Sequence, residues 1–371
     1  MASGAASVLP SFLVGALALQ IHDDLDAGVE AVAAGVTVFF LAGALTTGWG
    51  GRLADHIGAL RAMRRCILVT AAALGAAALA PSLPVLFALL AVAGVANAVM
   101  QPAINLFVAE QIPPDRQGFG FGVKQSGIPA AILVSGLALP VLALPLGWRV
   151  TLALCALAPL AVGVALPRGE AAHVSRRPVS RRPSRALLLT AFGAALGTAG
   201  PSALGAYLVA SGVDVGIEEG TAGLLAALAS GLSLATRVSL GARADRRKDY
   251  GLGVVVALLA AGSLGFALMA SDATGVFVLG AVVAFTLGWG WPGLFNLAVV
   301  DSNRETPGSA SGVSQTGIYA GAAFGPAAFG LLASTAGYGT AWAAVAVTTL
   351  MSAGVLWLAR RESAIPATYG V

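Results

Sequence analysis

Charged residues are scarce in this chain of 371 residues. Only 10% are Asp, Glu, Lys or Arg, whereas soluble globular domains carry about 25%. Hydrophobic residues make up 57% of the chain, more than so little polar surface can cover in water. They also form runs long enough to cross a bilayer, which takes about 20 residues; residues 188–210 are one such run. The alternating polarity of a transmembrane barrel is absent, so we predict an all-α membrane protein.

Cysteine and histidine are almost absent as well. Cys66 and Cys155 lie in separate apolar segments without a CxxC pattern or a neighbouring histidine, which argues against a disulfide framework and a metal site. His22, His56 and His173 fall in or near separate loops. No nucleophile, acid pair or set of metal ligands stands at a catalytic spacing. We therefore predict that the protein is not an enzyme and uses no cofactor and no metal.

Lysine and arginine are missing from the first seven residues, MASGAAS. A secretory signal peptide carries positive charge there, so we keep the first apolar run as a membrane span. Apolar runs, read against turn and charge clusters, predict twelve spans. They are residues 5–22, 29–50, 66–82, 85–109, 118–140, 149–166, 186–210, 219–240, 251–270, 274–299, 309–333 and 339–359.

The basic residues distinguish the two sides of the membrane. If both termini are cytoplasmic, 18 of the 21 Lys and Arg residues lie on the inner side, and only Arg149 lies on the outer side. The remaining two, Lys124 and Arg237, fall within spans. Because cytoplasmic loops are enriched in Lys and Arg, we predict a multi-pass protein of the plasma membrane with both termini in the cytoplasm.

The two halves of the chain repeat each other at an offset of 190 residues. GVKQSGI (122–128) returns as GVSQTGI (312–318), and GRLAD (51–55) returns as GARAD (241–245). The same offset aligns Gly15 with Gly205, Pro102 with Pro292, and Gly147 with Gly337. The offset covers six spans, an even number, so both copies cross the membrane in the same direction. We therefore predict two parallel six-helix repeats, an arrangement found in secondary transporters.

The domain organisation follows from the repeat. We predict an N-terminal six-helix bundle over residues 1–166, a basic cytoplasmic linker over 167–185, and a C-terminal six-helix bundle over 186–371. Arginine and proline without interleaved aromatic residues are weak grounds for nucleic-acid binding. We interpret the linker as a solvated tether, and we expect the lipid bilayer, not nucleic acid, as a partner.

The stretch GRLADHIGALR (51–61), between spans two and three, resembles the signature loop of the major facilitator superfamily. The residues that match its pattern are Gly51, Asp55, Gly58 and Arg61, with Gly241 and Asp245 as a degenerate second copy. The resemblance implies that family's fold over essentially the whole chain and a conformational latch at these residues. Gly51 permits close helix packing, and Asp55 suits a helix N-terminus, where a carboxylate is favoured by about 0.3–1 kcal/mol. Arg61 can pair with a carboxylate.

Polar residues within the spans are the candidates for substrate binding, because they are costly in lipid and mark substrate pathways. Lys124 lies about 9 Å into span five, and no acidic residue lies deep within any span. We interpret Lys124 as the group that binds an anionic substrate. Snorkelling to the interface and pairing with Glu110 are the alternatives. Its repeat partner is Ser314, an asymmetry that favours chemistry over packing.

Arg237 in span eight is the second cation within the membrane. RVSLG (237–241) resembles the Arg-x-x-x-Gly pattern of monocarboxylate transporters, which implies carboxylate binding, although snorkelling is equally compatible. Asn97, Gln101 and Asn105 share one face of span four, where they line a cavity or hydrogen-bond a neighbouring helix. The remaining candidates, for which gating or packing roles stay open, are Gln125, Gln315, Trp289, Asn296 and Tyr319.

These residues predict a secondary transporter of a small organic or inorganic anion, acting as a monomer by rocking of its two halves, with a proton as a possible coupling ion. Multidrug efflux by proton antiport is the alternative within transport. It calls for an embedded carboxylate, and span four has Leu90 where proton antiporters of the family commonly have arginine. A non-transporting membrane receptor or scaffold is the alternative from another class.

Overall fold

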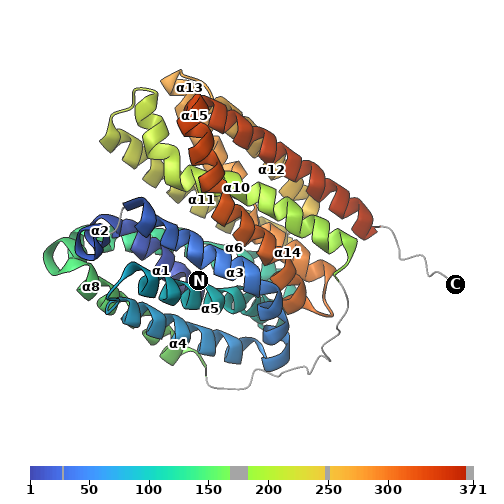
Figure 1. The fold of residues 1–371 in the computed structure, drawn as a ribbon. Helices are drawn as coiled ribbons and strands as arrows, with labels where there is room; N and C mark the ends of the chain where they lie inside the picture. The colour runs from blue at the N-terminus through green and yellow to red at the C-terminus, as the bar shows by residue number, and fades with distance from the viewer. Residues whose placement is uncertain (27–28, 168–182, 247–250, 365–371) are drawn as a thin grey trace. The chain divides into compact units, whose positions relative to one another are not determined.

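The computed structural model describes residues 1–26, 29–167, 183–246 and 251–364. Every regular element in these ranges is a helix (Figure 1). The elements are α1 (Ala2–Ala16), α2 (Ala18–Leu25), α3 (Val29–Ile57), α4 (Ala59–Ala77), α5 (Leu83–Gln111), η1 (Pro114–Arg116), α6 (Gln117–Gln125), α7 (Gly127–Ala138), η2 (Leu139–Ala143), α8 (Leu144–Cys155), α9 (Leu157–Ala165), α10 (Arg185–Asp214), α11 (Glu219–Arg246), α12 (Leu252–Leu268), α13 (Thr274–Val283), η3 (Ala284–Gly288), α14 (Pro292–Ser302) and α15 (Pro307–Ala364).

Each of the twelve predicted spans falls on helices of the part of the chain that the structure describes. Seven helical stretches are long and apolar enough to cross a bilayer. Two of them, Pro114–Ala165 and Pro307–Glu362, have 52 and 56 residues, which at 1.5 Å per residue is about 80 Å and enough for two crossings each. The remaining predicted spans fall on α1 and α12, which are shorter apolar helices, and on α4, which has 19 residues and a basic first half. The predicted all-α fold with twelve spans is confirmed.

The two double-length stretches break at repeat-related glycines. Gly147 has φ 79° and ψ 162°, and Gly337 has φ 84° and ψ 161°. A side chain with a Cβ rarely adopts positive φ, whereas glycine adopts it readily. The chain can therefore reverse between spans five and six, and between spans eleven and twelve, at equivalent positions of the two repeats.

Several helices extend beyond the apolar runs that predicted them. α4 begins at Ala59, seven residues before the predicted start, and α11 continues to Arg246. Backbone hydrogen bonds can continue through charged turns that hydropathy excludes from a span. The membrane-crossing segments are thus predicted well, and the ends of the helices less well.

The residues pack into two compact units. Unit 1 comprises Met1–Pro113, Val123–Val179 and Glu305–Tyr319; unit 2 comprises Pro114–Gly122, Ser180–Arg304 and Ala320–Val371. The first residues of span five (114–122) therefore pack with unit 2, and the first part of span eleven (305–319) packs with unit 1. Of the predicted linker, residues 168–182 lie outside the described residues, and the division at 166 and 186 remains a prediction.

Each unit has its own apolar core. In unit 1, α5 packs against α3 and α4 (Figure 1), and Leu13, Leu86 and Trp148 belong to one buried cluster. In unit 2 the core is richer in aromatic residues: the ring of Trp342 lies 4.4 Å from that of Phe329, between centroids. Burial of such side chains contributes about 1.5–3 kcal/mol each in water, while in lipid close packing and hydrogen bonds hold helices together.

Candidate functional site

Asp55 lies near the end of α3, and its carboxylate caps the first turn of α15. Oδ1 accepts a hydrogen bond from the N–H of Gly308 at 3.0 Å, and Oδ2 accepts from the N–H and the hydroxyl of Ser309, both at 2.6 Å. The first N–H groups of a helix lack intrahelical partners, and the positive end of the helix dipole favours a carboxylate. Asp55 thus stands at a helix N-terminus, as expected, while the contribution of Ser309 was not anticipated.

Asp245 makes the equivalent contacts in the second repeat. Its Oδ1 accepts from the N–H of Gly118 at 2.6 Å, and its Oδ2 accepts from the N–H of Phe119 at 2.8 Å. Gly118 and Phe119 are the residues 190 positions before Gly308 and Ser309. The two helix caps are therefore copies of each other, except that Phe119 has no hydroxyl to offer the carboxylate.

Gly51 and Gly241 lie one turn before the two aspartates, where two helix backbones approach each other closely. A Cβ at Gly51 would collide with the carbonyl oxygen of Gly308 and stand 2.9 Å from the Cα of Gly312. A Cβ at Gly241 would collide with the carbonyl oxygen of Gly118. Only glycine fits such contacts, because real Cβ atoms essentially never come within 3.0 Å of backbone atoms.

Gly58 and Arg61 complete the segment that resembles the family's signature loop. Gly58 has φ 86° and serves as the N-cap of α4, so it forms the sharp turn between spans two and three that only glycine adopts without strain. Arg61 is exposed on the first turn of α4. Their predicted part in a latch remains a prediction.

Asn97 is the centre of a hydrogen-bonded cluster halfway along α5. Its Nδ2 donates to the hydroxyl oxygen of Tyr319 at 2.6 Å. The Tyr319 hydroxyl in turn donates to the backbone carbonyl oxygen of Asn97 at 3.2 Å. Oδ1 of Asn97 accepts from Nε2 of Gln101 at 3.1 Å and lies 2.9 Å from the hydroxyl of Ser7. The structure thus brings together three predicted site residues, with Ser7 as a member that the sequence reading missed. The only feature of the sequence that pointed to Ser7 was the presence of a hydroxyl side chain in an apolar span.

The other amides of the predicted site are also buried. Asn105 follows Gln101 by one turn of α5, and its Oδ1 has no hydrogen-bond partner among the described residues. Gln125 ends α6, and Gln315 lies in α15 with an Oε1 that finds no partner in the described ranges. Unpaired polar atoms in a buried position are costly, so Asn105 and Gln315 are candidates for contact with water or a ligand.

Lys124 is buried in unit 1, in the last turn of α6. Its side chain is 4% exposed, and its Nζ has no hydrogen-bond partner in the described part of the chain. The backbone of Lys124 lies against α1, where a Cβ on Gly4 would stand 3.6 Å from the Lys124 carbonyl oxygen. Neither the pairing with Glu110 nor the snorkelling considered above accounts for a buried ammonium that makes no hydrogen bond.

Arg237 is buried in unit 2, at 1% exposure. Its Nε donates to the carbonyl oxygen of Trp289 at 3.1 Å, and its guanidinium carbon lies 5.2 Å from the centroid of the Trp289 ring. That carbonyl is available because span ten is interrupted between η3 and Pro292, the first residue of α14. The arginine thus satisfies a backbone carbonyl group that the break in the helix leaves without an intrahelical partner.

We expect Arg237→Lys to lower the thermal unfolding midpoint of the purified protein. Lysine keeps the charge but cannot donate from an Nε position or stack as a flat guanidinium, so the loss corresponds to about 1–3 kcal/mol. Thermal denaturation in detergent measures the change. The exposed Arg304, changed to lysine, is the control and should leave the midpoint in place; an equal effect at both positions would contradict this account of Arg237.

Asn296, the last predicted residue of unit 2, lies in α14 at 1% exposure. Neither Nδ2 nor Oδ1 has a hydrogen-bond partner among the described residues. Buried amides are normally hydrogen-bonded. A buried amide whose donor and acceptor are both unpaired is therefore a candidate for contact with a ligand. Its use in substrate binding remains a prediction.

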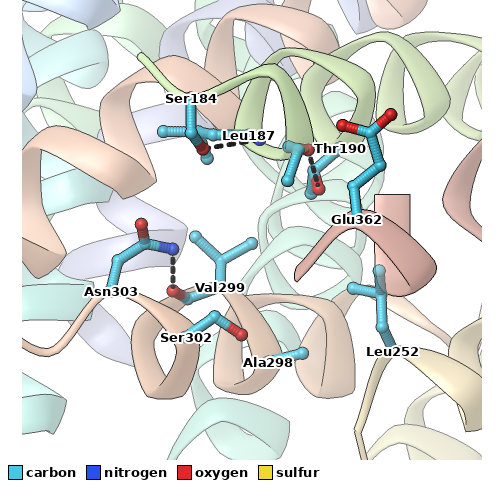
Figure 2. Close-up of a pocket in the computed structure, with 10 residues that line it drawn as sticks. Ser184, Leu187, Thr190, Leu252, Ala298, Val299, Ser302, Asn303 and Glu362 are labelled. Atoms are coloured by element: carbon cyan, nitrogen blue, oxygen red, sulfur yellow. Dashed lines mark hydrogen bonds between the residues drawn. The ribbon is translucent and has the colours of Figure 1, made fainter. Parts of the chain in front are cut away.

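One pocket of 350 Å³ lies in unit 2, away from the predicted site residues (Figure 2). Its lining comes from the first turns of α10, the start of α12, and the ends of α14 and α15. Figure 2 shows Ser184, Thr190 and Glu362 on one side and Asn303 and Ser302 on the other. Glu362 is already paired with Arg185 at 3.4 Å. No predicted residue lines this pocket, and no group of three metal-ligating side chains occurs in the described residues.

The twelve crossings and the two repeat-related helix caps define a membrane protein built from parallel repeats, the class to which many secondary transporters belong. The family model described as Major Facilitator Superfamily matches residues 1–326. The chain belongs to this family of transporters. It is therefore a multi-pass membrane protein of a kind that acts on small-molecule substrates.

Two solved structures are similar to the chain over nearly its whole length. The human organic anion transporter MFSD10 (TETRAN) is 14% identical, with a TM-score of 0.71; the match covers 95% of this chain and 99% of that protein. The proton:xylose symporter XylE bound to 6-bromo-6-deoxy-D-glucose is also 14% identical, with a TM-score of 0.71, and the match covers 96% and 95%. At this identity the likeness shows the fold alone. No curated protein matches the chain in sequence.

Proposed function

We propose that the protein is a secondary transporter that carries a small organic or inorganic anion across the plasma membrane. The observation that carries this proposal is Lys124. Its ammonium is buried and makes no hydrogen bond within the described residues. A buried unpaired charge costs several kcal/mol after relaxation, and a bound anion offsets that cost. Arg237 supplies a second buried cation, already oriented by Trp289.

Transport proceeds, in this proposal, by rocking of the halves 1–166 and 186–371 about a central site, with the linker 167–185 as a tether and both termini in the cytoplasm. The two carboxylate caps act as latches. Segment 305–319 belongs by sequence to the second half but packs in unit 1, so separation of the halves has to break the Asp55 cap. Segment 114–122 belongs by sequence to the first half but packs in unit 2, where Gly118 donates to Asp245, so separation of the halves has to break this cap as well. The transporter works as a monomer, and a proton is the candidate coupling ion.

The comparison structures include an organic anion transporter and a sugar symporter. Both share the fold at an identity too low to transfer a substrate, so the anionic class rests on the residues of this chain. The polar atoms of Asn105, Gln315 and Asn296 that lack partners among the described residues are the proposed uncharged contacts of the solute.

We expect Lys124→Gln to weaken anion transport about tenfold to hundredfold, because a hydrogen bond to a charged group contributes about 1.5–3 kcal/mol. Uptake of radiolabelled lactate, benzoate, nitrate and sulfate into proteoliposomes measures the effect, with xylose and a hydrophobic cation as competing classes. The exposed Arg361, whose guanidinium stacks on Trp357 at 3.7 Å, provides the control Arg361→Gln, which should transport normally.

Three outcomes would count against the proposal. Full anion transport by Lys124→Gln would show that the ammonium of Lys124 does not bind the transported anion. Transport restricted to hydrophobic cations would favour multidrug efflux, and absence of any solute movement in well-folded protein would favour a receptor or scaffold.

A further inference from the structure

The hydrogen-bonded cluster around Asn97 is not repeated at the positions 190 residues away, among the residues that the structure describes. In unit 1 it consists of Ser7, Asn97, Gln101 and Tyr319. The residues 190 positions away are Gly197, Leu287, Trp291 and Pro129. There an added Cβ on Gly197 would meet Ser352 Oγ at 2.7 Å, Leu259 at 3.2 Å and the indole ring of Trp291 at 3.4 Å, and the indole N–H of Trp291 has no hydrogen-bond partner among the described residues. The second repeat is thus assembled without an amide or hydroxyl side chain at any of these four positions.

The polar cluster is therefore not needed to build a six-helix repeat. Buried amides and hydroxyls have a desolvation cost that apolar packing avoids. In the membrane, a hydrogen bond between helices contributes little stability on average, which is a weak reason to keep four polar side chains together. The asymmetry between the repeats indicates a role in function.

The geometry fixes which way the Asn97 amide points. Oδ1 accepts from Gln101 and lies within hydrogen-bond distance of Ser7, so Nδ2 is directed at Tyr319. The Tyr319 ring lies against α3: an added Cβ on Gly43 would stand 3.0 Å from it, and the Phe40 centroid is 6.1 Å away. Asn97 is the middle residue of the 29-residue helix α5, which puts this contact at mid-membrane depth.

Tyr319 also stands where α15 passes from one unit to the other. It is the last residue of Glu305–Tyr319, which packs in unit 1, and Ala320 begins the part of α15 in unit 2. When segment 305–319 leaves unit 1, the tyrosine hydroxyl leaves Asn97. Nδ2 then loses its acceptor until water or a solute oxygen takes the place of the tyrosine hydroxyl.

We propose that the Tyr319 hydroxyl occupies, in this state, the position on Asn97 that an acceptor oxygen of the substrate takes when segment 305–319 has moved away. Tyr319 is then a built-in competitor of the solute, and Asn97, held by Gln101 and Ser7, is the group that recognises a carboxylate or hydroxyl oxygen. A solute that binds Nδ2 stabilises the opened state and shifts the population toward it. The inference rests on the proposed transport cycle and not on the charge of the solute.

The first test follows the conformation without any solute. Ser311 is fully buried in the inner part of α15, so Ser311→Cys, in a background with Cys66 and Cys155 changed to alanine, reports on opening through its reaction with a membrane-impermeant maleimide. We expect Tyr319→Phe, which removes both contacts of the hydroxyl with Asn97, to increase this labelling rate threefold to tenfold, because the net contribution of hydrogen bonds to stability is modest. Phenylalanine keeps the ring contacts with Phe40 and Gly43. An unchanged rate would overturn the proposal.

The matched control is Tyr207→Phe. Tyr207 packs on Phe329 in unit 2, with 4.9 Å between ring centroids, and the same loss of a hydroxyl there should leave Ser311 labelling unchanged. An equal increase from both tyrosines would mean that the reporter measures general loosening, and it would overturn the specific role of Tyr319.

The second test uses lactate, which carries both a carboxylate and a hydroxyl. If Tyr319 competes with the solute, the lactate concentration that gives half-maximal thermal stabilisation falls threefold to tenfold in Tyr319→Phe. A tyrosine that binds the solute directly would raise that concentration, and a purely structural tyrosine would leave it unchanged; either result contradicts the proposal. Asn97→Leu, which copies Leu287 of the other repeat, should abolish the stabilisation.

The two proposals fail separately. If lactate, nitrate and sulfate stabilise no variant, the anionic substrate class is wrong, whereas the Ser311 labelling rate still decides whether Tyr319 holds the closed state. If lactate stabilises the wild type and Tyr319→Phe equally and labelling is also unchanged, the anion proposal stands and the competitor role of Tyr319 is excluded.

Discussion

Replacing Gly51 with alanine should lower transport about a hundredfold while leaving insertion of the protein into the membrane intact. The added Cβ would collide with the carbonyl oxygen of Gly308 and come within 2.9 Å of the Cα of Gly312. Both are backbone atoms, so no rotamer change relieves the collision. Overpacking costs about 1–3 kcal/mol or more, and 3 kcal/mol reduces the population of the closed state more than a hundredfold. The closed state is the one in which segment 305–319 packs in unit 1. A transport cycle that cannot reach it cannot move solute across the membrane.

Helix propensity opposes this effect but is too small to cancel it. Alanine is more favourable than glycine within a helix by about 1 kcal/mol, so Gly51→Ala stabilises α3 locally while it prevents its approach to α15. Gly48 lies one turn away on the same helix, and a Cβ there meets nothing within 4 Å. Gly48→Ala is therefore the matched control, with equal or slightly higher stability and normal transport.

Uptake into proteoliposomes and the Ser311 labelling rate together measure this prediction. Gly51→Ala should raise labelling and lower uptake, and Gly241→Ala, at the equivalent position of the other repeat, should lower uptake in the same way. Normal uptake by both glycine variants would show that the close backbone contacts are not part of the transport cycle.

Neutralising the two capping aspartates should shift the protein strongly toward the opened state. The Asp55 carboxylate accepts hydrogen bonds from the N–H of Gly308 and from the N–H and hydroxyl of Ser309, the latter two at 2.6 Å, and it also meets the positive end of α15. Asparagine at this position loses the charge and one acceptor oxygen. Hydrogen bonds to charged groups contribute about 1.5–3 kcal/mol, so Asp55→Asn should raise Ser311 labelling about tenfold to hundredfold.

The second aspartate should have the smaller effect. Asp245 accepts two hydrogen bonds, because Phe119 lacks the hydroxyl that Ser309 provides to Asp55. The double variant of both aspartates should be more open than either single variant, with transport lost. Ser309→Ala removes the hydroxyl contact with Asp55. After this change, neutralising Asp55 should raise Ser311 labelling by about as much as neutralising Asp245.

Asp301→Asn is the control for these charge changes. Asp301 is partly exposed and pairs with Arg304 three residues later on the surface, and such pairs contribute about 0–1 kcal/mol. It should leave labelling and transport unchanged. Wild-type labelling in the double variant of Asp55 and Asp245 would show that the caps do not hold the closed state.

The sequence predicted the helices of the membrane more reliably than the contacts of the site. Apolar runs, basic residues and the offset of 190 led to twelve spans in two parallel repeats, and the family match agrees. Asn97 and Tyr319 were both candidates, but nothing in the sequence linked two residues 222 positions apart. Ser7 and Ser309 were missed because single serines in apolar or loop-flanking segments carry no distinctive pattern.

The amino-acid sequence by itself determined the class of protein, the number of crossings and the repeat, because hydropathy and charge act on each segment locally and lipid enforces them. Only the tertiary structure decided that the first parts of spans five and eleven pack in the unit opposite to their half of the chain, and that Asp55 and Asp245 each cap a helix far away in sequence. Those pairings depend on how backbones approach one another in space, at distances that only glycine permits, and no local pattern encodes them.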